Sequence, residues 1–120
     1  MLLVDAANVI GSRPTGWWRD RPGAARTFVD QVGRAIALGQ LTGPVTVVLE
    51  GKACAGVPAG LVDGVHVHHA PGSADDMLVA LISKATDQVN LVTADRELRE
   101  RAEGLGAGVV GPKWLIERLE

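Results

Sequence analysis

Short apolar segments alternate with longer amphipathic segments along this chain, and this alternation restricts the fold more than any other feature. The apolar segments have the length and β-branched content of strands, and they occupy residues 2–4, 44–51, 64–70, 89–94 and 107–111. The amphipathic segments repeat apolar residues at helical spacing, and they occupy residues 22–39, 73–85, 95–106 and 112–119. Strands joined by helices cross over with the right hand and form a parallel sheet between two helical layers. The sequence therefore predicts an α/β fold, a three-layer α/β/α domain with a five-stranded, mostly parallel sheet.

The chain has 120 residues, the length of one domain, and we expect residues 1–120 to form that domain without a linker or an internal repeat. Two loops are expected, over residues 6–21 and residues 52–60. No apolar run approaches the length of a membrane span, and no basic segment precedes the first apolar run as in a signal peptide. Cys54 is the only cysteine, which excludes an internal disulfide and favours a reducing, cytoplasmic setting.

Acidic residues follow the ends of four of the predicted strands. Asp5 comes directly after the first strand, Glu50 closes the second, and Asp95 follows the fourth. Asp75 and Asp76 open the helix that follows the third strand. Parallel strands end at one edge of a sheet, and ligands bind at that edge near the point where the strand order reverses. We therefore expect four separate segments to bring these carboxylates to one edge.

Carboxylates gathered at one edge repel one another, and a bound divalent cation relieves that repulsion. Clusters of Asp and Glu oxygens suit Mg²⁺ or Mn²⁺, and such an ion can activate water and stabilise a phosphoryl transition state. Asn8, three residues after Asp5, would then orient a carboxylate or a scissile phosphate as a neutral amide.

Most of these acids also have a purely structural explanation. Ser73 and Asp76 match a capping box, and Asp75 beside them suits the positive end of a helix dipole. Asp95 has the position of a helix N-cap, and the acid that closes the second strand can be an ordinary loop residue. Asp5 has no such explanation, because no local element is expected to need an acid there. Four acidic segments at one predicted edge favour a metal site over capping alone.

A basic segment follows the first strand, although the whole chain has a net charge of −2. Four arginines and one aspartate lie within residues 13–26, which form either a phosphate-binding surface or a solvated loop. Trp17 and Trp18 lie among these arginines, where they would either stack on bases or anchor the loop. We expect three of the arginines to flank the acidic site and contact phosphate, namely Arg13, Arg19 and Arg21.

Other chemistries have weaker support. His66 and His68 share a face of a predicted strand, but a zinc site needs more ligands than this sequence offers. The sequence contains no Walker-A loop, no G-x-G-x-x-G and no G-x-S-x-G, so we expect neither a nucleotide cofactor nor a nucleophilic serine.

Three stretches, taken in order, resemble the NYN branch of the PIN-like nucleases, a group that includes the bacterial YacP-like proteins. They are VDAANVIG from residue 4, GSADDMLVAL from residue 72 and LVTADRELRERAEGLGAGVVGP from residue 91. The family pattern is a strand ending in Asp-Gly-x-Asn, an Asp-Asp pair opening a helix, and a strand ending in Thr-x-Asp-Arg. No single motif is specific, but the ordered set spans nearly the whole chain.

The resemblance implies metal-dependent cleavage of RNA phosphodiesters. It implies that the metal-binding carboxylates are Asp5, Asp76 and Asp95, with Asp75 as a fourth candidate. Asn8 resembles the amide of the family pattern. Thr93 would lie beside Asp95 and orient it without touching the metal. Arg96, the residue after Asp95, would be a further substrate-binding candidate.

The sequence departs from the family pattern at two positions. Position 6 is Ala where the family usually has Gly, and Glu50 stands where many relatives have Asp. The first departure affects how closely the loop approaches a substrate. The second leaves open whether Glu50 joins the metal site.

Two hypotheses of different classes follow. The first is an endoribonuclease that hydrolyses single-stranded RNA with a Mg²⁺ or Mn²⁺ ion held by the acids. The second is a non-catalytic RNA-binding module of the same fold that docks RNA or a ribosome-associated partner. A toxin-type PIN ribonuclease with an antitoxin partner shares this fold, and a homodimer is a further open possibility. All the central acids are present, which favours the enzyme.

Overall fold

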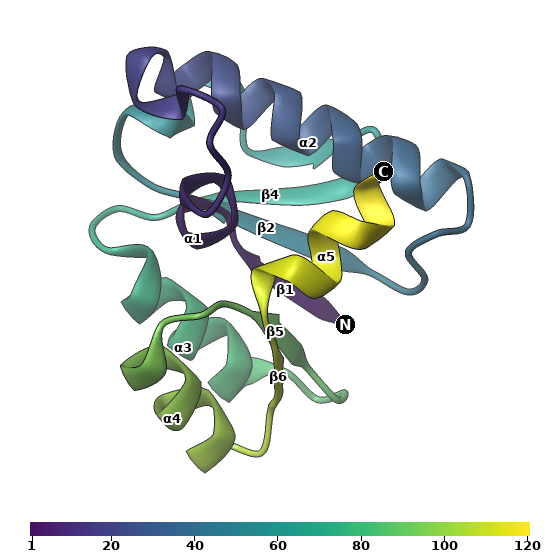
Figure 1. The fold of residues 1–120 in the computed structure, drawn as a ribbon. Coiled ribbons are helices and arrows are strands. Elements are labelled where there is room, and N and C mark those ends of the chain that lie inside the picture. The colour runs from purple at the N-terminus through teal and green to yellow at the C-terminus, as the bar shows by residue number, and fades with distance from the viewer.

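A six-stranded sheet forms the middle layer of the computed structural model, which describes residues 1–120 (Figure 1). The strand order is β3-β4-β2-β1-β5-β6, and every neighbouring pair is parallel except β3 with β4. The strands are β1 (Leu2–Asp5), β2 (Val45–Leu49), β3 (Gly60–Val62), β4 (Val65–His69), β5 (Asn90–Val92) and β6 (Gly108–Val110). This mostly parallel sheet between helices confirms the predicted fold class.

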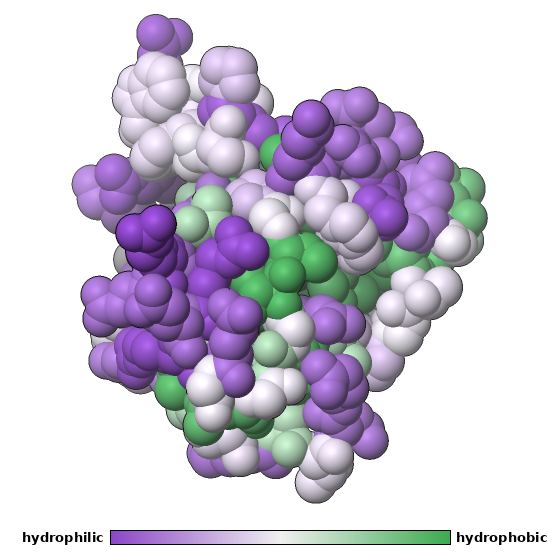
Figure 2. All heavy atoms as spheres, turned by 60° about the horizontal axis from the view of Figure 1, so that its bottom comes forward, coloured by the Kyte–Doolittle hydropathy of each residue, from purple (hydrophilic) through white to green (hydrophobic).

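Five α-helices cover the two faces of the sheet. On one face lie α1 (Ala6–Gly11), α2 (Arg21–Ala37) and α5 (Pro112–Leu119), and on the other lie α3 (Ala74–Lys84) and α4 (Arg96–Gly104). Two 3₁₀ helices, η1 (Trp17–Arg19) and η2 (Gly51–Gly56), connect these elements. Hydrophilic side chains gather on the surface over α3 and α4 (Figure 2). The exposed residues of α4 are almost all charged. No helix is long and apolar enough to cross a membrane.

The period-two alternation of the strands divides the core into two parts. In β1, Leu2 and Val4 join the cluster beneath α1, α2 and α5, whereas Leu3 joins the cluster beneath α3 and α4. All three side chains are buried, because a parallel sheet with helices on both faces leaves neither face to water. Burial on both faces explains why this strand reads as a continuous apolar run rather than an alternating one.

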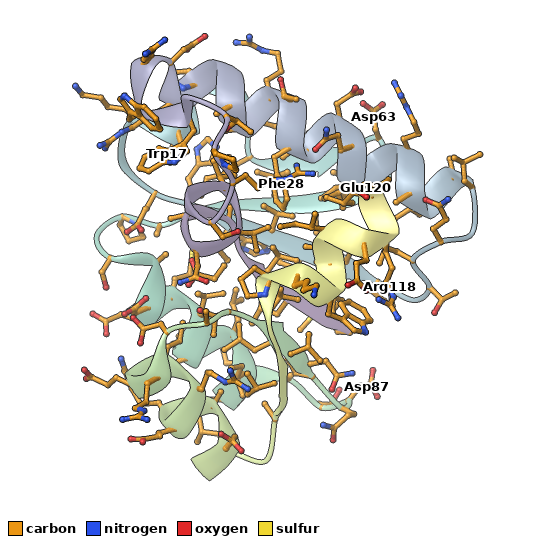
Figure 3. All side chains as sticks on the ribbon, in the orientation of Figure 1. Trp17, Phe28, Asp63, Asp87, Arg118 and Glu120 are labelled. Atoms are coloured by element: carbon orange, nitrogen blue, oxygen red, sulfur yellow. The ribbon has the colours of Figure 1, made fainter.

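Helix α2 forms where its apolar periodicity predicts. Asp20 caps it by accepting a hydrogen bond from the Gly23 N–H at 3.0 Å, and Pro22 occupies its first turn. Its buried face contains Ala25, Phe28, Val29, Val32 and Ala35. Phe28 points from the helix toward the sheet (Figure 3).

The structure corrects two details of the predicted arrangement. A sixth strand, β3, pairs with β4 in a hairpin whose turn residues Asp63 and Gly64 have φ of 47° and 83°. Asp-Gly with positive φ at both positions is typical of a two-residue hairpin turn, a local signal that the sequence interpretation missed. The expected loop over residues 6–21 is also wrong, because it contains α1 and η1, and the loop expected over 52–60 contains most of η2.

The strand order reverses beside β1, and this reversal positions the candidate site. From β1 the chain passes to β2 and β4 on one side, and α3 then carries it across to β5 on the other side. The carboxyl ends of β1, β2, β4 and β5 meet at the left of Figure 1, where α1, α3 and α4 begin. In open α/β sheets, ligands bind at the carboxyl edge near such a reversal, which lies here between β1 and β5.

Candidate active site

A buried carboxylate at the end of β1 forms the centre of the site. Asp5 is 5% exposed, and its Oδ2 accepts a hydrogen bond from the Thr93 hydroxyl at 3.0 Å. Thr93 is fully buried, and its Oγ1 accepts a hydrogen bond from the Asp95 N–H at 3.2 Å. The hydroxyl therefore links Asp5 at the end of β1 to the loop after β5 that carries Asp95.

Asp5 also begins a helix, which corrects the expectation that no local element needs an acid there. Helix α1 starts at the next residue, and Asp5 is its N-cap, accepting from the Asn8 N–H at 3.4 Å. The sequence interpretation missed this cap because it treated the segment as loop. The carboxylate is therefore used structurally, but a cap alone does not require burial, since Asp20 caps α2 while exposed.

The Asn8 side chain makes a second link between the end of β1 and the loop after β5. Its Oδ1 accepts a hydrogen bond from the Ala94 N–H at 2.8 Å, which joins α1 to the loop after β5. Asn8 thus fixes the backbone immediately before Asp95, and its Nδ2 donates no hydrogen bond in the structure. The amide is held in place by one atom and has its other atom free for a ligand.

Helix α3 brings two further acids to this edge, and they face different ways. Ser73 caps the helix, accepting from the Asp76 N–H at 3.4 Å, as predicted. The Asp76 carboxylate is exposed and lies 3.5 Å from the Arg101 guanidinium of α4, so it does not close the second half of a capping box. Asp75 is half-buried, and its carboxylate interacts electrostatically with Asp95 and Glu50.

Glu50 belongs to the same group of acids. Its Oε2 accepts a hydrogen bond from the Ala74 N–H at 3.0 Å, which ties the end of β2 to the start of α3. Its Oε1 has no partner in the protein. Asp95 is also half-engaged, because its Oδ1 accepts from the Leu98 N–H at 2.9 Å as the predicted N-cap of α4 and its Oδ2 is free.

The electrostatics show which acids interact. Burial raises the pKa of Asp5 from 3.8 to about 6, the hydrogen bonds from Thr93 and Asn8 lower it, and the charges of Asp75 and Glu50 raise it further. The pKa of Asp75 is also raised, first by burial and then by the charges of Asp95 and Glu50, whereas the Arg101 guanidinium lowers it. Asp75 therefore interacts electrostatically with Asp5, Glu50 and Asp95, and Arg101 offsets only part of this repulsion.

The structure does not bring these side chains into a closed metal cage. No group of three or more His, Cys, Asp or Glu side chains has an arrangement that could hold a metal ion. Among the five acids, the carboxylate oxygens without a protein partner are both oxygens of Asp75, Oδ2 of Asp76, Oδ2 of Asp95 and Oε1 of Glu50. The three histidines contribute nothing here, and a ring nitrogen of His69 contacts the Val57 carbonyl instead.

The basic segment divides among several locations. Arg13 donates a hydrogen bond to the Gln31 side chain at 3.0 Å, and Arg19 lies over the Trp18 ring at 5.8 Å from its centroid. Only Arg21 lines a cavity together with one of the acids, Glu50. Arg96 is exposed at the start of α4, next to Asp95.

That cavity, which we call the Trp17 cleft, has a volume of about 490 Å³ and lies beside the acids. Its lining comes from α1, η1, α2, the end of β2, η2 and the loop before α3, and includes Ala6, Ile10, Trp17, Arg21, Leu49 and Glu50. No short motif marks this cleft, because six segments distant in sequence form it. The sequence interpretation therefore did not predict it.

The geometry defines an α/β protein with a group of carboxylates at the strand-order reversal of its sheet. No family model matches the chain, and no curated protein matches it by sequence. Among solved structures, the chain is similar to a crystal structure of a mutant of Rae1 (YacP) from Bacillus subtilis, with a TM-score of 0.71 over 98% of this chain and 72% of that chain. The two sequences are 19% identical, so the similarity establishes a YacP-like fold.

Proposed function

We propose that this protein is a metal-dependent endoribonuclease that hydrolyses phosphodiester bonds of single-stranded RNA at the carboxyl ends of β1 and β5. The observation that carries the proposal is the convergence of Asp5, Glu50, Asp75 and Asp95 from four segments, with burial and mutual repulsion raising the pKa of Asp5 and Asp75. The YacP-like fold and the sequence resemblance to the NYN nucleases support the same activity.

The chemistry of the donor set fits a hard divalent cation. The atoms available to ligate a metal ion are all carboxylate oxygens, which Mg²⁺ and Mn²⁺ prefer over softer ligands. Mg²⁺ usually keeps several waters and is held by one or two carboxylates plus substrate phosphate, so a closed cage of three side chains is not needed. Asp75 and Asp95 would hold the ion. The negative charges of Asp5 and Glu50 would add to the attraction for it.

Hydrolysis needs a water that attacks phosphorus, a base for its proton and a departing ester oxygen. When bound, the ion would supply Lewis-acid stabilisation of the phosphoryl transition state. One oxygen of Asp75 can accept the proton from the attacking water as the water oxygen bonds to phosphorus and one P–O ester bond breaks. The departing ester oxygen then takes a proton from solvent. Asn8 Nδ2 can donate to a non-bridging phosphate oxygen, because Oδ1 is fixed by the Ala94 N–H.

Arginines predicted from the sequence would bind the rest of the RNA backbone. Arg21 lines the Trp17 cleft together with Glu50, and Arg96 follows Asp95 directly along the chain. Arg13 and Arg19 line no cavity with these acids and would contact phosphates away from the reacting one.

The test is to incubate purified protein with single-stranded RNA in Mn²⁺, in Mg²⁺ and in a chelator. We expect cleavage with a divalent ion and none with the chelator. Asp95→Asn should abolish cleavage while retaining the cap, since an amide oxygen caps a helix about as well as a carboxylate. Asp87→Asn is the matched control, because Asp87 is exposed and lies on the opposite side of the molecule (Figure 3).

The alternative is a non-catalytic RNA-binding module of the same fold, which is favoured by the lack of a grouped set of three metal ligands. This alternative predicts RNA binding without cleavage in every metal tested. Cleavage that persists in the chelator would contradict both readings and indicate a metal-independent or contaminating activity.

A further inference from the structure

The Trp17 cleft is next to the acids, and of its lining residues only Arg21 has a role in the proposed reaction, as a contact for the RNA backbone. Ala6, which follows Asp5 directly, and Glu50 both line it, as does Ser73 at the start of the helix that carries Asp75. A ligand in the cleft would therefore lie within one nucleotide's reach of the proposed reaction centre.

Trp17 is the aromatic wall of this cleft. Its ring also lines a second cleft that contains Arg13, so the indole separates two cavities, each of about 490 Å³. The guanidinium of Arg21 lies 5.6 Å from the Trp17 ring centroid. Trp18, by contrast, is 56% exposed, meets Trp17 edge-on at 5.8 Å between centroids, and lines neither cavity.

The lining restricts the chemistry of an occupant. Most of it is apolar, with Ala6, Ile10, Leu49 and Ala53, and its only carboxylate is Glu50. Its charged side chains are Glu50 and Arg21, and the Arg21 guanidinium lies over the Trp17 ring, so a phosphate bound to Arg21 would leave most of the apolar lining uncovered. A neutral, planar group with N–H donors fits instead, because it can cover the indole and donate to the free Oε1 of Glu50.

We propose that the Trp17 cleft binds one unpaired nucleobase of single-stranded RNA, stacked on Trp17, with its flanking phosphate directed toward the acids. The proposal rests on the proposed function for the identity of the polymer. It deepens that function, because a base that enters the cleft must leave its pairing partner, so the strand at the reaction centre must be single-stranded.

The test measures binding separately from cleavage. A dye-labelled eight-nucleotide single-stranded RNA is titrated with protein in a chelator, alongside a series in which one nucleotide at a time is abasic. We expect one abasic position to weaken binding by about tenfold, since stacking one base on an aromatic side chain accounts for that order of affinity. Trp17→Ala should weaken binding of the intact RNA by about tenfold and remove the sensitivity to that abasic position.

A second variant fills the cleft without removing any contact. Ala24 lines the cleft from α2, and Ala24→Leu introduces a good helix former whose side chain occupies the space. It should reproduce the effect of Trp17→Ala, with a melting temperature that reports whether the fold is intact. Leu38→Ala is the control and should bind like the wild type, because Leu38 is exposed after the end of α2 and lines neither cavity.

The outcomes separate this inference from the nuclease proposal. If no abasic position matters, if the wild type binds no RNA, or if both cleft variants bind like the wild type, the inference is wrong. Cleavage of the same RNAs in Mn²⁺ is scored independently. Cleavage that is unaffected by the abasic position and by both cleft variants would support the nuclease proposal and contradict the base-binding site. The expected binding pattern without cleavage would support the base-binding site and contradict the nuclease proposal.

Discussion

Asp5 shows how one residue serves two purposes that conflict energetically. As the N-cap of α1 it contributes about 1 kcal/mol, the usual value for such a cap. As a buried carboxylate at an edge with other acids it is costly to ionise, which is why its pKa rises to about 6. A serine would cap the helix without that cost. The presence of an acid is therefore better explained by a ligand that its charge attracts.

The first prediction concerns Asp5→Asn in the metal-free protein. The pKa of Asp5 is about 6 in the folded state and 3.8 in the unfolded state. The stabilisation that comes from binding this proton is therefore complete below pH 3.8 and is lost as the pH rises through 6. At 1.36 kcal/mol per pKa unit the loss is about 3 kcal/mol at most. The free energy of unfolding of Asp5→Asn should therefore exceed that of the wild type more at pH 7.5 than at pH 4.

Urea unfolding in a chelator at the two pH values provides the measurement. A difference between variant and wild type that does not change with pH would show that the Asp5 charge is not destabilising in the folded state.

The second prediction compares two adjacent acids of α3. Asp75 faces Glu50 and Asp95, whereas Asp76 is exposed beside Arg101. Asp75→Asn should weaken Mn²⁺ binding by about 10- to 100-fold, and Asp76→Asn should change it much less, since exposed ion pairs contribute little. Calorimetric titration of both variants gives the affinities. A larger loss with Asp76→Asn would assign the metal to the acid that the family resemblance favours.

At the scale of elements, the start of α2 and η2 pack closely and together form much of the Trp17 cleft. Gly56 at the end of η2 lies directly against the Pro22 backbone, and a Cβ at position 56 would overlap the Pro22 carbonyl oxygen. The backbone of α2 cannot shift without moving the wall of the cleft, so only glycine allows this approach.

The third prediction follows from that contact. Gly56→Ala should lower the free energy of unfolding by about 1–3 kcal/mol, the usual cost of overpacking. Gly104→Ala is the control, because a Cβ at position 104 meets no atom within 4 Å. Alanine also has a higher helix propensity than glycine, so this change should not lower the stability. Denaturant unfolding of both variants is the measurement. Equal stability of the two would show that α2 and η2 can separate without loss.

At the scale of the whole molecule, the candidate site joins segments from both sides of the strand-order reversal. Asp5 and Glu50 follow neighbouring strands, Asp75 begins a helix that crosses the sheet, and Asp95 follows the strand on the far side of β1. An ion shared among them would stabilise the folded chain as a unit, since the unfolded chain does not hold these residues together.

The fourth prediction is that Mn²⁺ raises the melting temperature of the wild type. At 100 times its dissociation constant the ion adds about 2.7 kcal/mol, which corresponds to roughly 10 °C for a domain of this size. Asp95→Asn should lose this shift while keeping nearly the wild-type melting temperature in a chelator, because its cap is retained. A full shift in Asp95→Asn would make Asp95 a cap only and leave Asp5 and Asp75 as the candidate ligands.

The sequence alone determined the layers, the mostly parallel sheet and the edge at which the acids lie. It also indicated the caps at Ser73 and Asp95, because capping depends on residues only a few positions apart. These features follow from local periodicity and from the direction that parallel strands share. The short elements α1 and β3 escaped, since six and three residues are too few to establish a period.

Only the tertiary structure decided which side chains meet. Adjacent residues on a helix point about 100° apart, so the choice between Asp75 and Asp76 depends on how α3 rotates to bury Ala74, Leu78 and Ile82. The choice between Trp17 and Trp18, and the existence of the Trp17 cleft, likewise depend on six segments packing together. Local sequence sets the direction and ends of each element, whereas the rotation and spacing of elements come from packing across the whole core, which no short pattern encodes.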